Sequence, residues 1–107
     1  MSTSYNNLPL VLNTVGNQKR FELQLPEGVA YVEYMQNKQG VIYLTHTEVP
    51  VHLEGKGVGS ALLKKVFAHI RNLGVKLAPL CPFVASYLKR HPDEVKSMLA
   101  PGFFIGD

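Results

Sequence analysis

Three glycines at alternate positions lie near the middle of the chain, in the segment Glu54-Gly55-Lys56-Gly57-Val58-Gly59-Ser60. Glycines spaced in this way leave several backbone N–H groups free to point at one place, and their missing Cβ atoms allow a ligand to approach the main chain. A helix is predicted directly after the loop, and a helix N-terminus adds roughly half a positive charge. The loop therefore predicts a site for a phosphate or pyrophosphate, with Lys56 placed for a charge-assisted contact.

Two common phosphate-binding motifs do not fit this loop. A Walker A loop ends in Gly-Lys followed by Ser or Thr, whereas Lys56 is followed by Gly57. A dinucleotide-binding fingerprint requires G-x-G-x-x-G, and counted from Gly55 the last position is Ser60. The remaining alternative to an anion site is a glycine-rich turn that serves only the close packing of a strand against the helix.

The residues before the loop alternate in the manner of strands. Segments 10–15, 20–25, 29–35 and 41–46 are rich in β-branched, aromatic or alternating apolar residues and are separated by Gly, Pro or Asn. Because the connections are short, these segments predict an antiparallel meander. Residues 29–35 carry apolar groups on both faces, which predicts a central strand.

The residues after the loop change to a helical period. From Gly59 to Leu73 the apolar side chains repeat every three or four positions, and Gly74 is placed to end the helix. Residues 75–80 form the next predicted strand. A strand, a helix and a strand in succession predict a right-handed crossover and a parallel pair, with Pro79 indicating either the edge of the sheet or the point where the strand leaves it.

The C-terminal part of the chain predicts further helices. Pro82 is placed to open a second helix, and Pro92 is placed to open a third that ends near Leu99. The apolar residues 103–105 are expected to pack on the domain or on a partner, so a monomer or a weak dimer is predicted. Together the elements predict an α+β fold: an antiparallel meander followed by a helix, a parallel strand and C-terminal helices.

Length and composition limit the class of protein. The 107 residues suffice for one domain, predicted over 9–107 after a flexible tail over 1–8. The 11 basic and 8 acidic side chains give a net charge of +3, which suits a polyanionic small ligand. The sequence contains no basic stripe interleaved with aromatic residues, so a nucleic-acid partner is not predicted. The single cysteine, and the absence of a signal peptide or a membrane-spanning apolar run, predict a cytoplasmic protein without a membrane segment.

The region from Val49 to Leu63 resembles motif A of the GCN5-related N-acetyltransferases (GNAT), whose pattern is Q/R-x-x-G-x-G/A after a strand. Glu54 stands where Gln or Arg is usual. The resemblance extends over roughly residues 21–99 and is closest to the short, single-domain YjdJ-type branch. Three further segments carry it: His46-Thr47-Glu48-Val49-Pro50, Pro79-Leu80-Cys81-Pro82-Phe83 and Arg90-His91-Pro92.

The resemblance implies a minimal GNAT fold and an acetyl-coenzyme A-dependent N-acetyltransferase. In such enzymes the fourth and fifth strands splay apart, the pantetheine arm lies between them, and the pyrophosphate lies on the glycine loop. Tyr87 lies on the helix where larger relatives carry a tyrosine as general acid, offset by about one position. The residues implied to bind the cofactor are Thr47, Val49, Glu54, Gly55, Lys56, Gly57, Val58, Gly59, Ser60 and Tyr87.

Three side chains are candidates for the chemistry that the resemblance implies. His46 would lie beside the thioester and act as general base, unless it is a histidine hydrogen-bonded for structure. Glu48, on the same side, would orient His46 or act as base through water, unless it is a solvated charge at the rim. Cys81 precedes a predicted helix, whose N-terminus favours a thiolate, and is a candidate to accept the acetyl group. Its alternatives are a residue that lines the cofactor sulfur or a small buried hydrophobe.

The expected function is therefore acetyl transfer from acetyl-coenzyme A to an unidentified amine, which could be a protein lysine, a polyamine, an antibiotic or a small metabolite. The alternative is a module that binds coenzyme A with little or no turnover, because minimal chains lack the elements that usually build an acceptor pocket. No metal is predicted, since the four histidines show no i, i+4 pairing and have one cysteine beside them.

Overall fold

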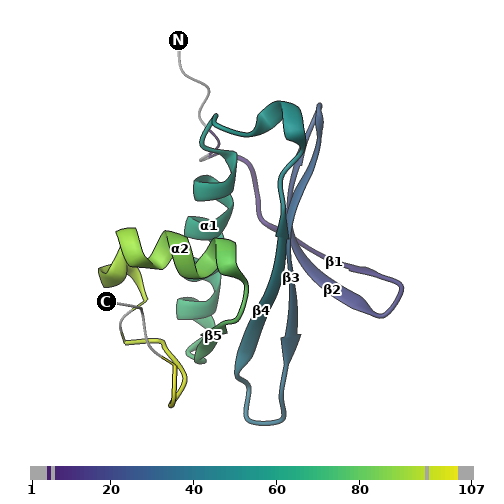
Figure 1. The fold of residues 1–107 in the computed structure, drawn as a ribbon. Coiled ribbons are helices and arrows are strands. Elements are labelled where there is room, and N and C mark those ends of the chain that lie inside the picture. The colour runs from purple at the N-terminus through teal and green to yellow at the C-terminus, as the bar shows by residue number, and fades with distance from the viewer. Residues whose placement is uncertain (1–4, 6, 96, 104–107) are drawn as a thin grey trace.

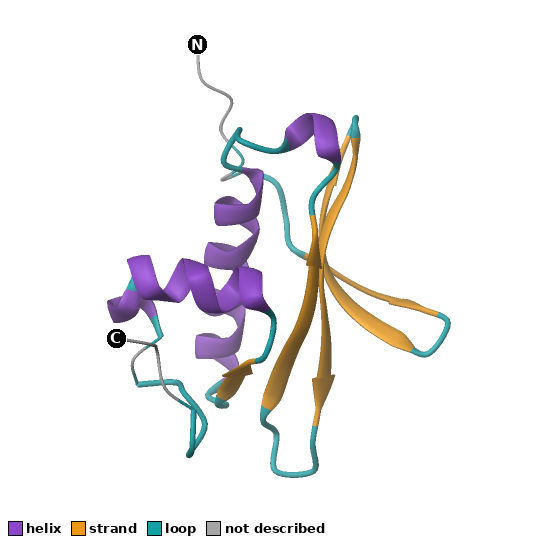
Figure 2. Ribbon diagram, viewed as in Figure 1, coloured by secondary structure: helices purple, strands orange, loops and turns teal. Residues whose placement is uncertain are grey.

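The computed structural model describes residues 5, 7–95 and 97–103, which form a mixed sheet with both helices on one of its faces (Figures 1 and 2). This arrangement confirms the predicted α+β fold. The strands are β1 (Val11–Val15), β2 (Gln18–Leu25), β3 (Gly28–Gln36), β4 (Ile42–Glu48) and β5 (Leu77–Pro79). The helices are α1 (Val58–Leu73) and α2 (Pro82–Arg90), with 3-10 turns η1 (Val51–Leu53) and η2 (Pro92–Glu94).

The strand order follows the chain, β1-β2-β3-β4-β5. The first four strands pair antiparallel, as the short connections predict, and β3 is central. The crossover through α1 brings β5 parallel to β4, where it pairs over Ile42–Leu77 to Leu44–Pro79. Pro79 thus lies in a short strand at the edge of the ladder, as predicted, and Gly74 ends α1 in the left-handed conformation with φ 72°.

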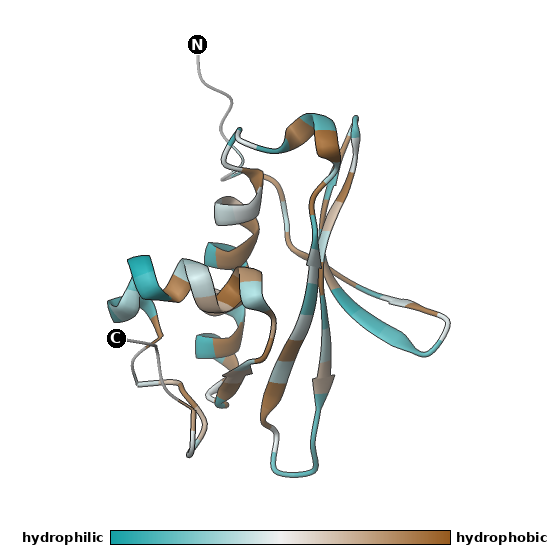
Figure 3. Cartoon of the chain, viewed as in Figure 1, coloured by the Kyte–Doolittle hydropathy of each residue, from teal (hydrophilic) through white to brown (hydrophobic). Residues whose placement is uncertain are grey.

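The core lies between the sheet and the two helices. Hydrophobic and hydrophilic residues alternate along β4, as Figure 3 shows, because only one face of the sheet is covered by helices. The apolar stripe predicted for α1 is buried: Leu62, Leu63, Val66, Phe67 and Ile70 are all inaccessible or nearly so. They face Phe21, Leu23, Val32 and Leu44 of the strands.

The predicted helix from Pro92 to Leu99 is wrong. Only η2 is helical, and the chain then runs beside β5, where Leu99 forms a parallel bridge with Leu77. The backbone N–H of Leu77 donates to the carbonyl of Met98, and the N–H of Ala100 donates to the carbonyl of Leu77. The segment therefore satisfies its backbone groups against the sheet edge instead of within a helix.

Both ends of the chain lie partly outside the described residues. Of the predicted tail over 1–8, Tyr5 and Leu8 are half-buried and pack against the core. Phe103 packs edge-on against Tyr43, with ring centroids 6.5 Å apart, whereas residues 104 and 105 lie outside the described part. Neither helix in the described ranges combines the length and the apolar character needed to cross a bilayer.

Candidate functional site

The glycine loop, residues 54–60, leads directly into α1. Gly55 and Gly57 have φ values of 79° and 83°, a region that favours glycine, and Gly57 is the N-cap of the helix. The first bond inside the helix is donated by Ala61 to the carbonyl of Gly57, and no side chain caps the helix. The N–H groups of residues 58–60 therefore remain available to an anion, and the first turn contains no acidic residue.

This loop forms one wall of a cavity of about 520 Å³ that reaches from the end of β4 to the last residue of α2. Its size suits a small ligand of the kind that clefts between secondary elements bind. The lining residues come from three regions of the sequence: Thr47, Glu48 and Val49; Leu53, Glu54, Gly55, Gly57, Val58, Gly59 and Ser60; and Phe83 and Arg90.

β4 and β5 part three residues before Thr47, the first β4 residue that lines the cavity. The ladder between them ends at Leu44 and Pro79, and proline has no N–H with which to continue it. The N–H groups of Leu80 and Cys81 both donate to the carbonyl of Leu44, at 3.1 and 2.9 Å, so the chain turns out of the sheet there. The predicted separation of the two strands thus begins one residue after Leu44.

A bulge in β4 decides which side chains face the cavity. His46 pairs with Glu33 but Leu44 pairs with Tyr34, so Thr45 is an extra residue whose hydroxyl donates to the Glu33 carbonyl at 3.1 Å. The extra residue exchanges the two faces of the strand from that point on. Strict alternation from the buried Leu44 would turn residue 46 toward the helices, whereas the bulge turns residue 47 there.

Thr47 and Cys81 consequently meet on the helix side of the point where β4 and β5 separate after Leu44 and Pro79, which we call the fork. The Thr47 hydroxyl and the Cys81 sulfur are 3.3 Å apart, and either atom can be the donor. Cys81 is only 3% exposed and is the N-cap residue of α2, as the sequence predicts. Cys81 does not line the cavity directly, so Thr47 separates it from the open space.

His46 and Glu48 lie together on the opposite face of the sheet. Their side chains are joined by a contact of 2.8 Å between His46 Nε2 and Glu48 Oε2, and each is about half exposed (51% and 53%). The predicted pairing of these two groups is therefore present. Glu48 also lines the cavity, whereas His46 does not, so the carboxylate connects the imidazole to the pocket.

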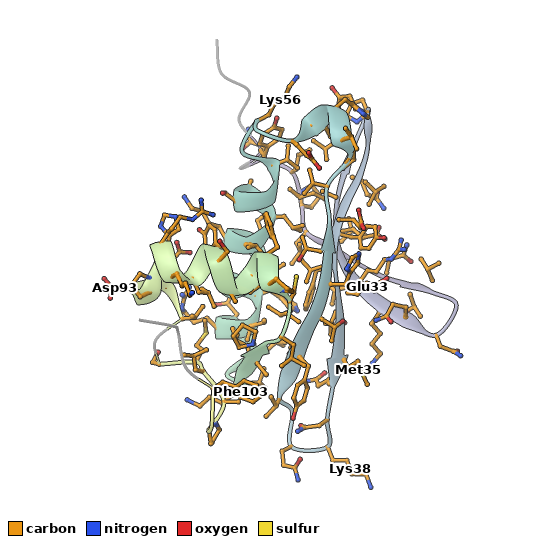
Figure 4. All side chains as sticks on the ribbon, viewed as in Figure 1. Glu33, Met35, Lys38, Lys56, Asp93 and Phe103 are labelled. Atoms are coloured by element: carbon orange, nitrogen blue, oxygen red, sulfur yellow. The ribbon has the colours of Figure 1, made fainter. Side chains whose placement is uncertain are left out.

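The face that carries His46 also holds a cluster of charged side chains. Arg20 lies 3.8 Å from Glu22 and 4.0 Å from Glu33, and its guanidinium stacks 3.7 Å from the centre of the Tyr31 ring. Glu22 is 2% exposed although no helix covers it, and Asn13 and Gln24 donate hydrogen bonds to its carboxylate. Figure 4 shows Glu33 on the side of the sheet away from the helices.

Phe83 closes the cavity over the first turn of α1. A Cβ placed at Gly59 would lie 2.6 Å from Cζ of Phe83 and 3.6 Å from a methyl carbon of Val49. Gly59 therefore permits the close approach of α2, in keeping with the packing alternative for this glycine, whereas Gly55 and Gly57 meet nothing within 4 Å. The sequence reasoning missed Phe83 as a lining residue, because its contact joins two helices far apart in the chain.

The cation in the cavity is Arg90, which the sequence reasoning also missed. Lys56, the predicted phosphate contact, does not line the cavity, and Figure 4 shows its side chain pointing away from the molecule. Arg90 is the last residue of α2 and lines the cavity together with Phe83 of the same helix. The sequence signal that could have indicated Arg90 is its place in Arg90-His91-Pro92, one of the segments that carry the family resemblance.

Tyr87 lies outside the cavity and has a structural partner. Its side chain is fully buried, and its hydroxyl donates to Oε2 of Glu94 at 2.8 Å, which ties α2 to η2. Burial raises the pKa of Tyr87, and the hydrogen bond and negative charge of Glu94 raise it further. These contacts favour the neutral phenol and hold its hydroxyl against Glu94, outside the cavity.

We expect Tyr87→Phe to lower the free energy of unfolding by about 1.5–3 kcal/mol, the range for a lost hydrogen bond to a charged group, with unchanged turnover. The pKa of Tyr87 is higher in the folded state than its unfolded value of about 10. Its contribution to stability is therefore fully present below that unfolded pKa and is lost as the pH rises through the higher folded-state pKa. Denaturant unfolding between neutral and alkaline pH should show a weaker alkaline loss in the variant. A large fall in kcat would instead make Tyr87 the general acid.

Comparison with known protein families agrees with this geometry. A family model described as GCN5-related N-acetyl-transferase matches residues 20–98. The match spans the bulged strand, the glycine loop, the fork at Cys81 and the cation at Arg90. No group of three or more His, Cys, Asp or Glu side chains is placed to hold a metal ion within the described ranges.

Proposed function

Because the chain belongs to the GCN5-related N-acetyltransferase family, we propose that it transfers an acetyl group from acetyl-coenzyme A to the nitrogen of an amine. The observation that carries this proposal is the continuity of the cavity. It joins an anion-binding helix N-terminus to Thr47 of β4, whose hydroxyl meets Cys81 where the chain leaves β5. A ligand with a phosphate end and a long, narrow reactive arm fits these two features together.

The residues around the cavity fit coenzyme A in their chemistry. The free N–H groups at residues 58–60, and the close approach that the missing Cβ atoms of Gly55 and Gly57 allow, suit a pyrophosphate. Thr47 near the end of β4, and Val49 just after it, lie beyond the end of the β4–β5 ladder and offer backbone groups to the amides of a pantetheine arm. Glu54 lines the cavity but is exposed, which keeps its carboxylate hydrated.

Acetyl-coenzyme A, when bound, supplies a thioester whose carbonyl carbon is the electrophile. His46 and Glu48 are proposed to take the proton from the attacking amine. When Nε2 of His46 donates its hydrogen to Glu48, the lone pair of Nδ1 is free to act as base, and the carboxylate stabilises the imidazolium that forms. Glu48 thereby fixes the tautomer of His46 and joins it to the cavity.

The acceptor is proposed to approach from the open face of the sheet, on which His46 lies. Among the described residues, Glu22, Glu33 and Glu48 lie on this face together with the guanidinium of Arg20. A surplus of carboxylates attracts a protonated amine and disfavours an anionic acceptor. This supports an amine of the lysine or polyamine kind, delivered to the base that deprotonates it.

Cys81 offers an alternative route to acetyl transfer in two steps. Its sulfur would attack the thioester carbon, with coenzyme A leaving as the thiol and carrying the cysteine proton. The amine would then attack the acetyl carbon on Cys81, the carbon–sulfur bond would break, and the proton lost by the amine nitrogen would pass to the departing sulfur, which becomes a thiol again. The Thr47 hydroxyl, 3.3 Å from the sulfur, is placed to donate to it when it is charged.

Intact-mass spectrometry after mixing with acetyl-coenzyme A tests this route. We expect one acetyl group on the wild-type chain in the absence of amine, none on Cys81→Ala, and loss of the label on adding a primary amine. Thr47→Val should slow the labelling by about tenfold, because it removes a hydrogen bond to a charged sulfur. Turnover by Cys81→Ala at the wild-type rate would show that the amine attacks the thioester directly.

A further inference from the structure

Arg90 is the only cation among the described residues that line the cavity. It is exposed, and no hydrogen bond or ion pair joins its side chain to another described residue. Two carboxylates, Glu48 and Glu54, line the same cavity. A guanidinium held at the edge of a cavity without a protein partner is available to a ligand anion, with which it makes strong paired hydrogen bonds.

Arg90 lies some distance from the N–H groups at the start of α1. Phe83 and Arg90 are seven residues apart on α2, so they share one face of the helix and are separated by roughly 10 Å along its axis. Phe83 is the residue that touches the first turn of α1 at Gly59. The cavity therefore has two separate anion-binding groups, a helix N-terminus beside Phe83 and a guanidinium about two helical turns further out.

We propose that Arg90 binds the 3′-phosphate of coenzyme A, while the first turn of α1 binds the pyrophosphate. The inference rests on the proposed function, because it assumes that coenzyme A fills the cavity. Coenzyme A carries two separate anions, a pyrophosphate on the 5′ side of its ribose and a terminal phosphate on the 3′ side. A terminal phosphate presents several free oxygens to a guanidinium fork, whereas a pyrophosphate is well matched by successive backbone N–H groups.

Titration calorimetry with coenzyme A and with 3′-dephospho-coenzyme A tests this assignment on the full chain. We expect the wild type to bind coenzyme A about tenfold more tightly than the dephospho form, as one charge-assisted contact at an exposed site would give. Arg90→Ala should bind both ligands alike, with the affinity for coenzyme A lowered about tenfold and that for the dephospho form nearly unchanged. Arg90→Lys should keep part of the preference.

Lys89→Ala is the matched control, because it removes the same charge one residue earlier from a side chain outside the cavity. It should keep the wild-type preference for coenzyme A. Equal binding of the two ligands by the wild type, or an equal loss for both in Arg90→Ala, would overturn the assignment while leaving the cofactor site in place. Failure of the wild type to bind either ligand would overturn the proposed function, and this inference with it.

Discussion

Replacing Gly57 by aspartate should lower the affinity for coenzyme A by about 100-fold while the fold remains intact. The new carboxylate would stand at the N-cap of α1, beside the N–H groups that the pyrophosphate is proposed to occupy. Two unit charges about 4 Å apart near a protein surface repel each other by roughly 4 kcal/mol, which is more than the 2.8 kcal/mol or so that a 100-fold loss requires. Titration calorimetry with coenzyme A measures the effect.

Gly57→Asn is the control for this variant. Asparagine has the same shape as aspartate, tolerates the left-handed conformation at φ 83° equally well, and meets nothing within 4 Å. Both variants should therefore unfold at similar denaturant concentrations, and Asn should bind coenzyme A within about tenfold of the wild type. Equal affinities of the Asp and Asn variants for coenzyme A would show that its pyrophosphate does not bind at this helix terminus.

Replacing His46 by glutamine should lower kcat for acetyl transfer by 100-fold or more, within the range of about 10²–10⁴ that a general base contributes. The affinity for acetyl-coenzyme A should not change, because His46 does not line the cavity. Steady-state kinetics measures kcat, and titration calorimetry with acetyl-coenzyme A measures the affinity.

Two further variants separate catalysis from structure at this position. Glu48→Gln keeps the hydrogen bond to His46 but not the charge, so a smaller loss of about tenfold is expected. Because His46 is half exposed, added imidazole should restore part of the activity of a His46→Ala variant. A His46 variant that keeps its turnover, or that loses affinity for acetyl-coenzyme A in proportion, would assign the histidine a structural role.

Local sequence signals predicted most of the fold. The short turns predicted the meander, the change of period after Gly59 predicted α1, and Gly74 and Pro82 marked a helix end and a helix start correctly. The glycine loop and the fork at Cys81 were predicted from the same signals together with the family resemblance, which the family match confirms. These features depend on backbone conformations that particular residues favour locally.

The features that the sequence did not reveal depend on contacts across the fold. Thr45 has no residue type that marks a bulge, and its extra position appears only in the pairing of β4 with β3. Arg90 and Phe83 reach the cavity because α2 lies across the start of α1, and Lys56 misses it because of the direction in which Gly55 and Gly57 turn the loop. Strand pairing and helix packing at long range set these positions.

The most direct test is to measure amine-dependent conversion of acetyl-coenzyme A by the wild-type chain, with the N-acetylated product identified by mass spectrometry. Lysine-type amines and polyamines should yield N-acetyl product and free coenzyme A in equal amounts over many turnovers. Gly57→Asp should lose this activity at limiting acetyl-coenzyme A, and Gly57→Asn should keep it. Binding of acetyl-coenzyme A with no amine product, or with no more than one acetyl group released per chain, would contradict the account and leave a coenzyme A-binding module.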